Sequence, residues 1–412
     1  MTLSAAQETP YSHELAWPPH LRPFDPWDES IKADPYAHYA WMHEHAPVLR
    51  ARTPAGDAWF LSRYRDVQLA FRSAKIFSSR RPDPKVFPNV VASDEPDHTR
   101  LRSVVAHAFT PKAVARVEGQ VRATAEGLLR PMIASGGGEV VGNFAIPLTM
   151  STIAGLMGLS LSKTAQFRQW TEDYTSLLGR LLGSSPGSPT DASGTAAFVA
   201  HMDQALDAAP LEADTVLSCI ARSRADGKIT GSEAAAFGPL LFDAGSQTTS
   251  LLIGNGFIVL SEMPHLLARL RANPADVPKF VEELLRCRSS VHRMRRVTTE
   301  SVEVSGQRIP EGAAVYLLMA AANRDAEKFP NPAVFDMDRD TGGHLGFGFG
   351  IHACLGSWLA RMEARIVFEL LAQTVSAVAL DPDPRRAVVP MTAGSGVVSG
   401  PKALTVRLAP LQ

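Results

Sequence analysis

The sequence predicts a mainly α-helical fold with small antiparallel β-sheets. Helical periodicity dominates the chain from His98 to Leu285. Within that region, an apolar helix of about 30 residues begins at Thr230 and is stopped by Pro264. Short strand patterns follow in the C-terminal half, namely "SVEVSG", "AAVYLLMA" and "KALTVRLAP". No linker composition separates these parts, so we expect a single domain over residues 1–412.

The N-terminal part shows little regular structure. Residues 1–35 are rich in Pro, Trp and His and predict an irregular arm laid over the body. The segment "AWFLSRYRDVQLAFRS" predicts a short strand followed by a helix. A loop is expected from Pro82 to Pro96, which holds four prolines. A flexible connection is expected in "GSSPGSPTDASG", from Gly183 to Gly194.

The long helix combines a clear start with a local conflict at its centre. Thr230 and Glu233 have the spacing of a capping box, in which each side chain satisfies the other's free backbone N–H. The middle, "LLFDAGSQTTSLLIGNG", is apolar on nearly every face and is therefore expected to be buried. Gly245 and two threonines nevertheless lie where good helix formers are expected. Such a conflict inside a buried helix points to function.

Composition excludes several classes of protein. A net charge of −1 offers no basic surface for nucleic acid, and three widely spaced cysteines favour a reducing compartment over a disulfide scaffold. No signal peptide is recognisable. Val140–Ser162 and Ala244–Ser261 are uncharged, but their Asn, Gln, Ser and Thr side chains are unfavourable in lipid. We therefore expect buried core helices in a cytoplasmic protein that contacts neither membrane nor nucleic acid.

Cys354 lies in the Gly-rich segment "FGFGIHACLG", shortly before a helix pattern. A lone intracellular cysteine is most often a small buried apolar residue. Here Gly348, Gly350 and Gly356 allow close backbone approach and positive φ, and a helix N-terminus stabilises a thiolate. Cys354 has no second cysteine at CxxC spacing, so a structural zinc site is poorly supported. The pattern favours a flat, bulky ligand that lies against the backbone and takes the Cys354 sulfur as its axial bond.

This segment resembles the haem-ligand loop of the cytochrome P-450 superfamily, the haem-thiolate monooxygenases. Phe347, Gly350, Cys354 and Gly356 occupy the positions of the family pattern. The resemblance, which is to the soluble bacterial branch, continues in "EELLR" and "ANRD" and covers roughly residues 35 to 408. It implies the P-450 fold and haem b, iron protoporphyrin IX, with Cys354 as the axial ligand. Thiolate ligation is this family's way of favouring O–O cleavage.

The resemblance also implies roles for residues around the haem. The residues expected to contact the cofactor are His98, Arg102, Arg296, His344, Phe347, Gly348, His352 and Gly356. The cationic or hydrogen-bond-donating side chains among them are expected to bind its propionates. Taken singly, each histidine or arginine is more often an ordinary surface residue or a core histidine. Glu283 and Arg286 share one helix face and are expected to be buried with Arg339. The alternative is a surface ion pair of little weight.

The conflict inside the long helix matches the family's oxygen-binding motif. The resemblance implies that Ala244 and Gly245 open a groove for O2 and that Thr248 hydrogen-bonds the oxygen under activation. Thr248 could instead only bond back to a carbonyl four residues earlier. Gln247 stands where the family usually has an acid, and Gln cannot relay a proton by losing one. Asp243 is expected either to substitute partly for that acid or to face the pocket and bind a polar or cationic group of the substrate.

Family analogy implies that substrate contacts come from the Pro82–Asp94 loop, the long helix, the segment after Arg286 and the last β-turn. The expected residues are Phe87, Val90, Val91, Leu240, Asp243, Ala244, His292, Met294, Val397 and Val398. Each of them is also compatible with a packing or surface position. His292 and Asp243 predict a pocket that is more polar than usual.

The resemblance implies a cytochrome P-450 monooxygenase that uses O2 to oxidise a small or medium organic substrate in secondary metabolism. Electrons are expected from NAD(P)H through a ferredoxin or flavodoxin and its reductase, with an acidic ferredoxin docking on the cysteine side of a monomer. Two alternatives stay open. One is oxidative coupling that forms a C–N, C–O or C–C bond in a natural product. The other is a non-catalytic partner protein, against which the retained Cys354 and Thr248 argue.

Overall fold

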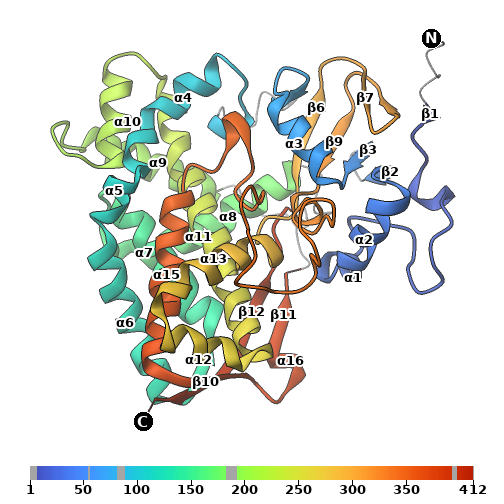
Figure 1. Cartoon of the computed structure of the whole chain (residues 1–412). Coiled ribbons are helices and arrows are strands. Elements are labelled where there is room, and N and C mark those ends of the chain that lie inside the picture. Colours follow the sequence, from blue (N-terminus) through green and yellow to red (C-terminus); the bar gives the residue numbers. More distant parts are fainter. Residues whose placement is uncertain (1–6, 54–55, 81–88, 182–192, 392–396, 412) are drawn as a thin grey trace.

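The computed structural model describes residues 7–53, 56–80, 89–181, 193–391 and 397–411. Helices make up the larger part of the molecule, and the largest sheet lies to one side of them, next to the N-terminal helices (Figure 1). The mainly helical fold with small sheets is thereby confirmed.

The helices of the described residues follow the chain in the order of their labels. The α-helices are α1 (Glu29–Ala33), α2 (Tyr36–His45), α3 (Tyr64–Arg72), α4 (Asp97–Val105), α5 (Pro111–Ala115), α6 (Glu118–Ala134), α7 (Ile146–Met157), α8 (Thr164–Leu181), α9 (Ser193–Asp207), α10 (Val216–Ala225), α11 (Gly231–Glu262), α12 (Pro264–Ala272), α13 (Val277–Cys287), α14 (Met319–Ala322), α15 (Ser357–Thr374) and α16 (Pro384–Ala387). Short helical turns are η1 (Ser12–Glu14), η2 (Val90–Ala92), η3 (Ala106–Phe109), the π-helical η4 (Val141–Ala145), η5 (Leu161–Lys163), η6 (Pro274–Asp276) and η7 (Gly350–His352).

The strands are short, as the sequence predicts. They are β1 (Gln7–Glu8), β2 (Val48–Thr53), β3 (Gly56–Leu61), β4 (Phe77–Ser78), β5 (Gly137–Glu139), β6 (Met294–Thr298), β7 (Val302–Val304), β8 (Gln307–Ile309), β9 (Ala314–Leu317), β10 (Val375–Leu380), β11 (Val388–Pro390) and β12 (Pro401–Pro410). They form sheets of order β2-β3-β9-β6-β4, β10-β12-β11 with β5 beside β12, and β1-β8-β7.

Two predictions about the strands are wrong in detail. Most strand pairs are antiparallel, but β3 is parallel to β9 and β1 is parallel to β8. The C-terminal half also does not hold all of the β structure. β3 and α3 confirm the strand and the helix expected in "AWFLSRYRDVQLAFRS", and β2 and β4 join β3 in the largest sheet. Pairing between distant strands cannot be read from local patterns. The apolar run "AAVYLLMA" divides into β9 and α14, since short apolar runs fit a strand and a buried helix equally well.

The long helix α11 is confirmed at both ends. The N–H of Thr230 donates to Oε2 of Glu233 at 2.8 Å, and the N–H of Glu233 donates to Oγ1 of Thr230 at 3.2 Å. Pro264 begins the next helix, α12. α11 packs against α7, α9 and α15, and its apolar side chains belong to the largest core cluster. Figure 1 shows α11 and α15 within the helical part of the molecule.

No single helix of the described ranges is long and apolar enough to cross a membrane. α11 and α12 reach that length and hydropathy only as a pair, and the pair is bent by 103°. Most of the expected flexible connection from Gly183 to Gly194 lies outside the described residues, as does the first half of the Pro82–Pro96 loop.

Candidate active site

Two glycines shape the loop that carries Cys354. Gly348 has a φ of 68° and Gly350 a φ of 73°, a backbone region that favours glycine. A Cβ at Gly350 would also lie 2.7 Å from the carbonyl oxygen of Phe71 in α3. The N–H of Cys354 donates to the carbonyl of Phe347 at 2.8 Å and closes the loop. Gly356, at the start of α15, has a φ of −84°, so the expected positive φ is wrong there.

The thiol of Cys354 is desolvated, although the residue keeps exposed surface. Cys354 is exposed, whereas Cys219 and Cys287 are buried. Desolvation raises the pKa of the Cys354 thiol, and it outweighs the Gly356 N–H and the charge of Arg102, which favour the thiolate. The expected stabilisation of a thiolate is therefore not achieved by the polypeptide alone. A cation at the sulfur, such as a bound metal ion, would supply what is missing.

Basic side chains from distant segments gather beside this loop. The rings of His98 and His352 have centroids 4.3 Å apart. Nη2 of Arg102 donates to the carbonyl of Ala353 at 2.8 Å. Burial, followed by the charges of Arg296 and His98, lowers the pKa of His352 to about 3. The structure therefore brings together four of the five side chains that were expected to bind propionates.

The two arginines of this group lack an anionic partner within the described ranges, whereas Nδ1 of His98 lies 3.3 Å from Oε1 of Glu95. Arg102 and Arg296 form no ion pair there, and burial lowers the pKa of both, to about 10 for Arg296. His98 Nε2 is buried without a hydrogen-bond partner in that part of the chain. Buried charges and donors are unfavourable when they are unpaired. The donor set therefore fits a ligand that brings carboxylates, as haem does with its two propionates.

The central turn of α11 keeps one face open. Ala244 is exposed and Gln247 and Thr248 are half-buried, whereas Ser246 is buried between them. Oγ1 of Thr248 donates to the carbonyl of Ala244 at 2.9 Å. The back-bonded alternative is thus observed, and it leaves the hydroxyl oxygen of Thr248 free to accept a hydrogen bond.

Gly245 departs from its expected role in opening a groove. A Cβ at Gly245 would lie 2.5 Å from Cδ1 of Ile153, which belongs to α7. The glycine therefore admits a neighbouring side chain, and Ala244 is the small residue that borders open space. The prediction for Gly245 is wrong because the side chain that fills its space comes from a segment about 90 residues away.

Glu283, Arg286 and Arg339 form the buried cluster that the sequence predicts. The first two have no exposed side-chain surface, and Nε and Nη2 of Arg286 each bond the Glu283 carboxylate at 2.7 Å. Nε of Arg339 approaches Oε1 of Glu283 at 3.4 Å. Arg286 also donates to the carbonyl of Asn323 at 2.8 Å. The cluster thus ties α13 to the segment that leads into the cysteine loop.

Comparisons with known proteins agree with this geometry. The family model described as Cytochrome P450 matches residues 195–408. Cytochrome P450 107B1 of Saccharopolyspora erythraea is 36% identical over 362 residues, which cover 82% of this chain and 87% of that protein. The chain belongs to the cytochrome P450 family. It is a P450 monooxygenase, an oxidoreductase of a family that carries thiolate-ligated haem.

Further P450 proteins are similar over nearly the whole chain. The monooxygenase PikC of Streptomyces venezuelae is 33% identical over 395 residues, which cover 92% of each protein. The crystal structure of CalO2 matches with a TM-score of 0.85 at 29% identity, and it covers 94% of this chain and 99% of its own.

His344 of this P450 does not join the other basic residues. Its Nε2 lies 3.0 Å from Oε2 of Glu282, and its Nδ1 accepts the N–H of Gly346 at 3.1 Å. Both ring nitrogens are therefore engaged within the protein. The prediction that His344 binds a propionate is wrong for this arrangement, because a neighbouring acid, invisible in the local motif, already takes the available donor.

His292 also departs from its predicted role in the substrate pocket. It is buried, and its ring lies 5.8 Å from the ring of Tyr36 and 6.3 Å from that of Tyr39, both in α2. Burial and the charge of Arg324 lower its pKa to about 3, so it is neutral. The ring packs under the N-terminal helices, a contact that no local sequence pattern predicts.

The other expected substrate residues have mixed surroundings. Val90 and Leu240 are buried at 8% and 9% exposure, and Val91 is 38% exposed. Half-buried positions are found for Asp243, Met294, Val397 and Val398. Phe87 lies outside the described residues.

Sequence reasoning missed Ser79 and Asp94. Oγ of Ser79 lies 2.9 Å from Nε2 of His352, and the backbone N–H of Ser79 donates to Oδ1 of Asp94 at 2.8 Å. This pair positions a haem-side histidine. The only local signal is Asp94 shortly before Pro96, a common turn composition, so neither residue could be assigned without the fold.

Proposed function

We propose that this P450 inserts an oxygen atom from O2 into a small or medium organic molecule of the natural-product type, in the cytoplasm and as part of secondary metabolism. The observation that carries this proposal is the convergence of Cys354 with Arg102 and Arg296, neither of which has an anionic partner within the described ranges. Relatives named 6-deoxyerythronolide B hydroxylase and cyclomarin C epoxidase are 31% and 32% identical to this chain. Their names support a substrate of this kind.

In this proposal the sulfur of Cys354 would hold the haem iron. When bound, the haem supplies reductive activation of O2, with thiolate ligation favouring O–O cleavage. Arg102 and Arg296 neutralise the propionates, and His98 donates through its free Nε2. The φ of 68° at Gly348 turns the backbone of the loop at the point where it is expected to face the macrocycle.

The open face of α11 is assigned to the oxygen side. The hydroxyl hydrogen of Thr248 is directed to the Ala244 carbonyl, so the hydroxyl oxygen is held as an acceptor. Gln247 lies on the same face and can hold water through its amide, but it has no titratable proton. Protons must then come through water, so delivery is weaker than with an acid at position 247.

The departure from an acid at Gln247 raises a second candidate, oxidative coupling within a natural product. Coupling and oxygen insertion each take up two protons per O2, so the product formed, and not the proton supply, distinguishes them. For a monooxygenase, Gln247→Glu is expected to raise the yield of oxygenated product and to lower peroxide release. In a coupling enzyme the same change leaves the coupled product dominant. Steady-state turnover with product and hydrogen peroxide both counted distinguishes the two candidates.

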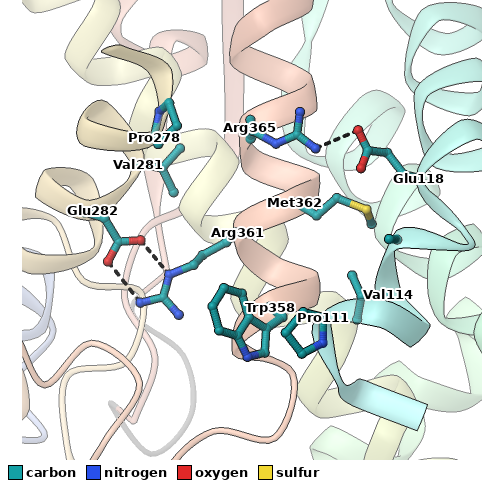
Figure 2. Close-up of a pocket in the computed structure, with 11 residues that line it drawn as sticks. Pro111, Val114, Glu118, Pro278, Val281, Glu282, Trp358, Arg361, Met362 and Arg365 are labelled. Carbon is teal, nitrogen blue, oxygen red and sulfur yellow. Dashed lines mark hydrogen bonds and ion pairs between the residues drawn. The ribbon is translucent and has the colours of Figure 1, made fainter. Parts of the chain in front are cut away.

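Electrons are proposed to come from NAD(P)H through a ferredoxin or flavodoxin and its reductase. Figure 2 shows a surface pocket of about 240 Å³ lined by Trp358, Arg361 and Arg365 of α15, the helix that follows Cys354. Trp358 is 51% exposed. The arginines already pair with Glu282 and with two further acids, so the surface is not strongly cationic. The cysteine side remains our proposed docking side, without a preference for an acidic partner.

The reduced carbon monoxide difference spectrum of the purified protein tests the main proposal. A thiolate-type Soret band is expected. Cys354→Ala should abolish it, whereas Cys287→Ala, which changes a buried cysteine away from the loop, should retain it. A wild-type protein without this band would contradict the proposal. Haem binding with the band but without turnover of any substrate and partner would instead indicate a non-catalytic protein.

A further inference from the structure

Asp243 is a carboxylate inside the helical part of the molecule, and it has no cationic partner among the residues that the structure describes. It is half-buried on α11, and Oγ1 of Thr175 in α8 donates to its Oδ1. Among the residues that the structure describes, Asp243 forms no ion pair. Desolvation raises its pKa to about 6, and the bond from Thr175 opposes that rise. The side chain is therefore mostly ionised at neutral pH.

The carboxylate lies on the open face of α11. Asp243 lies four residues before Gln247, and Ala244 lies four residues before Thr248, so the four residues form two adjacent rows along α11, and all four retain accessible surface. Phe242 is buried. Asp243 thus lies on an accessible side of the helical turn that carries Thr248. Their Cα atoms are separated by about 7.5 Å along the helix axis.

A charge in this position is not explained by packing. Thr175 could hold α8 against α11 equally well through an uncharged Asn, and a desolvated carboxylate without a counter-ion is unfavourable. Thr175 engages one oxygen and orients the group, which leaves the second oxygen to accept a further bond. A protonated amine matches both the remaining acceptor and the missing charge.

We propose that Asp243 binds a protonated amine of the substrate. This inference rests on the proposed monooxygenase function and narrows its substrates to organic molecules that carry a basic nitrogen. Two roles were expected for Asp243, namely partial replacement of the missing acid at position 247 or binding of a polar or cationic group of the substrate. The structure favours the second role, because the hydrogen bond to Asp243 comes from Thr175 in α8 and not from the side chain of Gln247. Thr175 acts as a positioning residue for the carboxylate.

Spin-shift titration of the haem-loaded protein tests the proposal. The probes are a panel of tertiary amines in which a dialkylamino group is attached to an aryl-containing or macrocyclic scaffold of graded size. Each amine is paired with the isostere in which a CH group replaces the nitrogen. Tertiary amines are chosen because crowding hinders ligation of the iron. At least one amine is expected to bind about tenfold or more tightly than its isostere, as a charge-assisted bond allows.

Two variants assign the selectivity to this site. Asp243→Asn keeps the size and the bond to Thr175, and it should weaken amine binding about tenfold to a hundredfold while leaving the isostere unchanged. Thr175→Val keeps the charge, so a preference for the amine should survive in it. If no amine binds better than its isostere, or if the preference survives in Asp243→Asn, the proposal is wrong. Should Asp243→Asn not fold, the wild-type panel decides.

The reduced carbon monoxide spectrum separates the two levels of the proposal. A missing thiolate-type band would overturn the proposed function and the amine site with it. An intact band together with equal binding of amines and isosteres would overturn the amine site alone.

Discussion

Glu363 shows at the scale of one residue how strongly burial changes chemistry. It is 1% exposed, and neither carboxyl oxygen has a hydrogen-bond partner among the described residues. Thr152 of α7 lies beside it but donates its hydrogen to the carbonyl of Leu148 at 3.0 Å. Burial raises the pKa of Glu363 to about 8. The group is therefore a neutral acid at physiological pH.

This pKa predicts the pH dependence of stability. The folded protein keeps a proton on Glu363 that the unfolded chain, with a pKa of 4.5, releases. The contribution to stability is complete below pH 4.5, decreases as the pH rises, and is lost above about 8. Glu363→Gln removes this titration. The free energy of unfolding of the variant relative to that of wild type should therefore rise by about a few kcal/mol between pH 4.5 and about 8.

Urea unfolding of both proteins at a series of pH values measures the difference. Glu369→Gln, on the same helix but ion-paired with Arg122 and Arg365, is the control and should not be stabilised as the pH rises. A constant difference between Glu363→Gln and wild type would contradict the prediction.

At the scale of elements, α11 is fitted to its neighbours through glycine. A Cβ at Gly238 would collide with Met202 of α9, one at Gly245 with Ile153 of α7, and one at Gly256 with Phe368 of α15. Glycine weakens a helix interior. Here each glycine lets a side chain from another helix reach the α11 backbone. The glycines therefore set how closely these helices approach.

Gly245→Ala is expected to destabilise the fold by about 1–3 kcal/mol, because the added methyl meets Cδ1 of Ile153. Gly127→Ala in α6 is the matched control. A Cβ there meets nothing within 4 Å, so better helix propensity should stabilise it slightly. Ile153→Val, which removes Cδ1, should restore part of the stability of Gly245→Ala. Thermal unfolding checks all three, and equal effects of the two Gly→Ala changes would refute the close contact.

At the scale of the whole molecule, the Glu283 cluster joins parts of the chain that are distant in sequence. Besides its arginine partners, Oε1 of Glu283 accepts the N–H of Asp336 at 2.9 Å. Oδ1 of Asn323 in turn accepts the N–H of Leu345 at 2.6 Å, two residues before the segment that carries Cys354 begins. Through Asn323, these bonds connect Arg286 of α13 to the residues that immediately precede the cysteine loop.

Arg286→Gln should cost about 3–5 kcal/mol of stability, because it removes the two short bonds from the only arginine that contacts both oxygens of this fully buried carboxylate in the described part of the chain. Arg168→Gln breaks the exposed i,i+4 pair with Glu172 and should cost less than about 1 kcal/mol. Denaturant unfolding of the two variants gives the comparison. Similar losses in both would show that the buried cluster does not stabilise the molecule as described.

Features that depend on near neighbours could be predicted from the sequence alone. The capping box of Thr230 and Glu233, the stop at Pro264 and the positive φ of Gly348 follow from the chemistry of adjacent residues. The pairing of Glu283 with Arg286 follows from helical spacing. The cysteine motif was informative for the same reason, since its residues lie within one short loop.

Contacts between groups that are distant in the sequence became visible in the folded molecule. His352 and His344 look alike in the sequence, yet one lies beside His98 and the other pairs with Glu282. The pairing of β3 with β9, the filling of Gly245 by Ile153 and the contact of Asp243 with Thr175 were likewise undecided. Each is set by side chains or strands from separate elements, and their proximity is a property of the packed molecule and not of any local pattern.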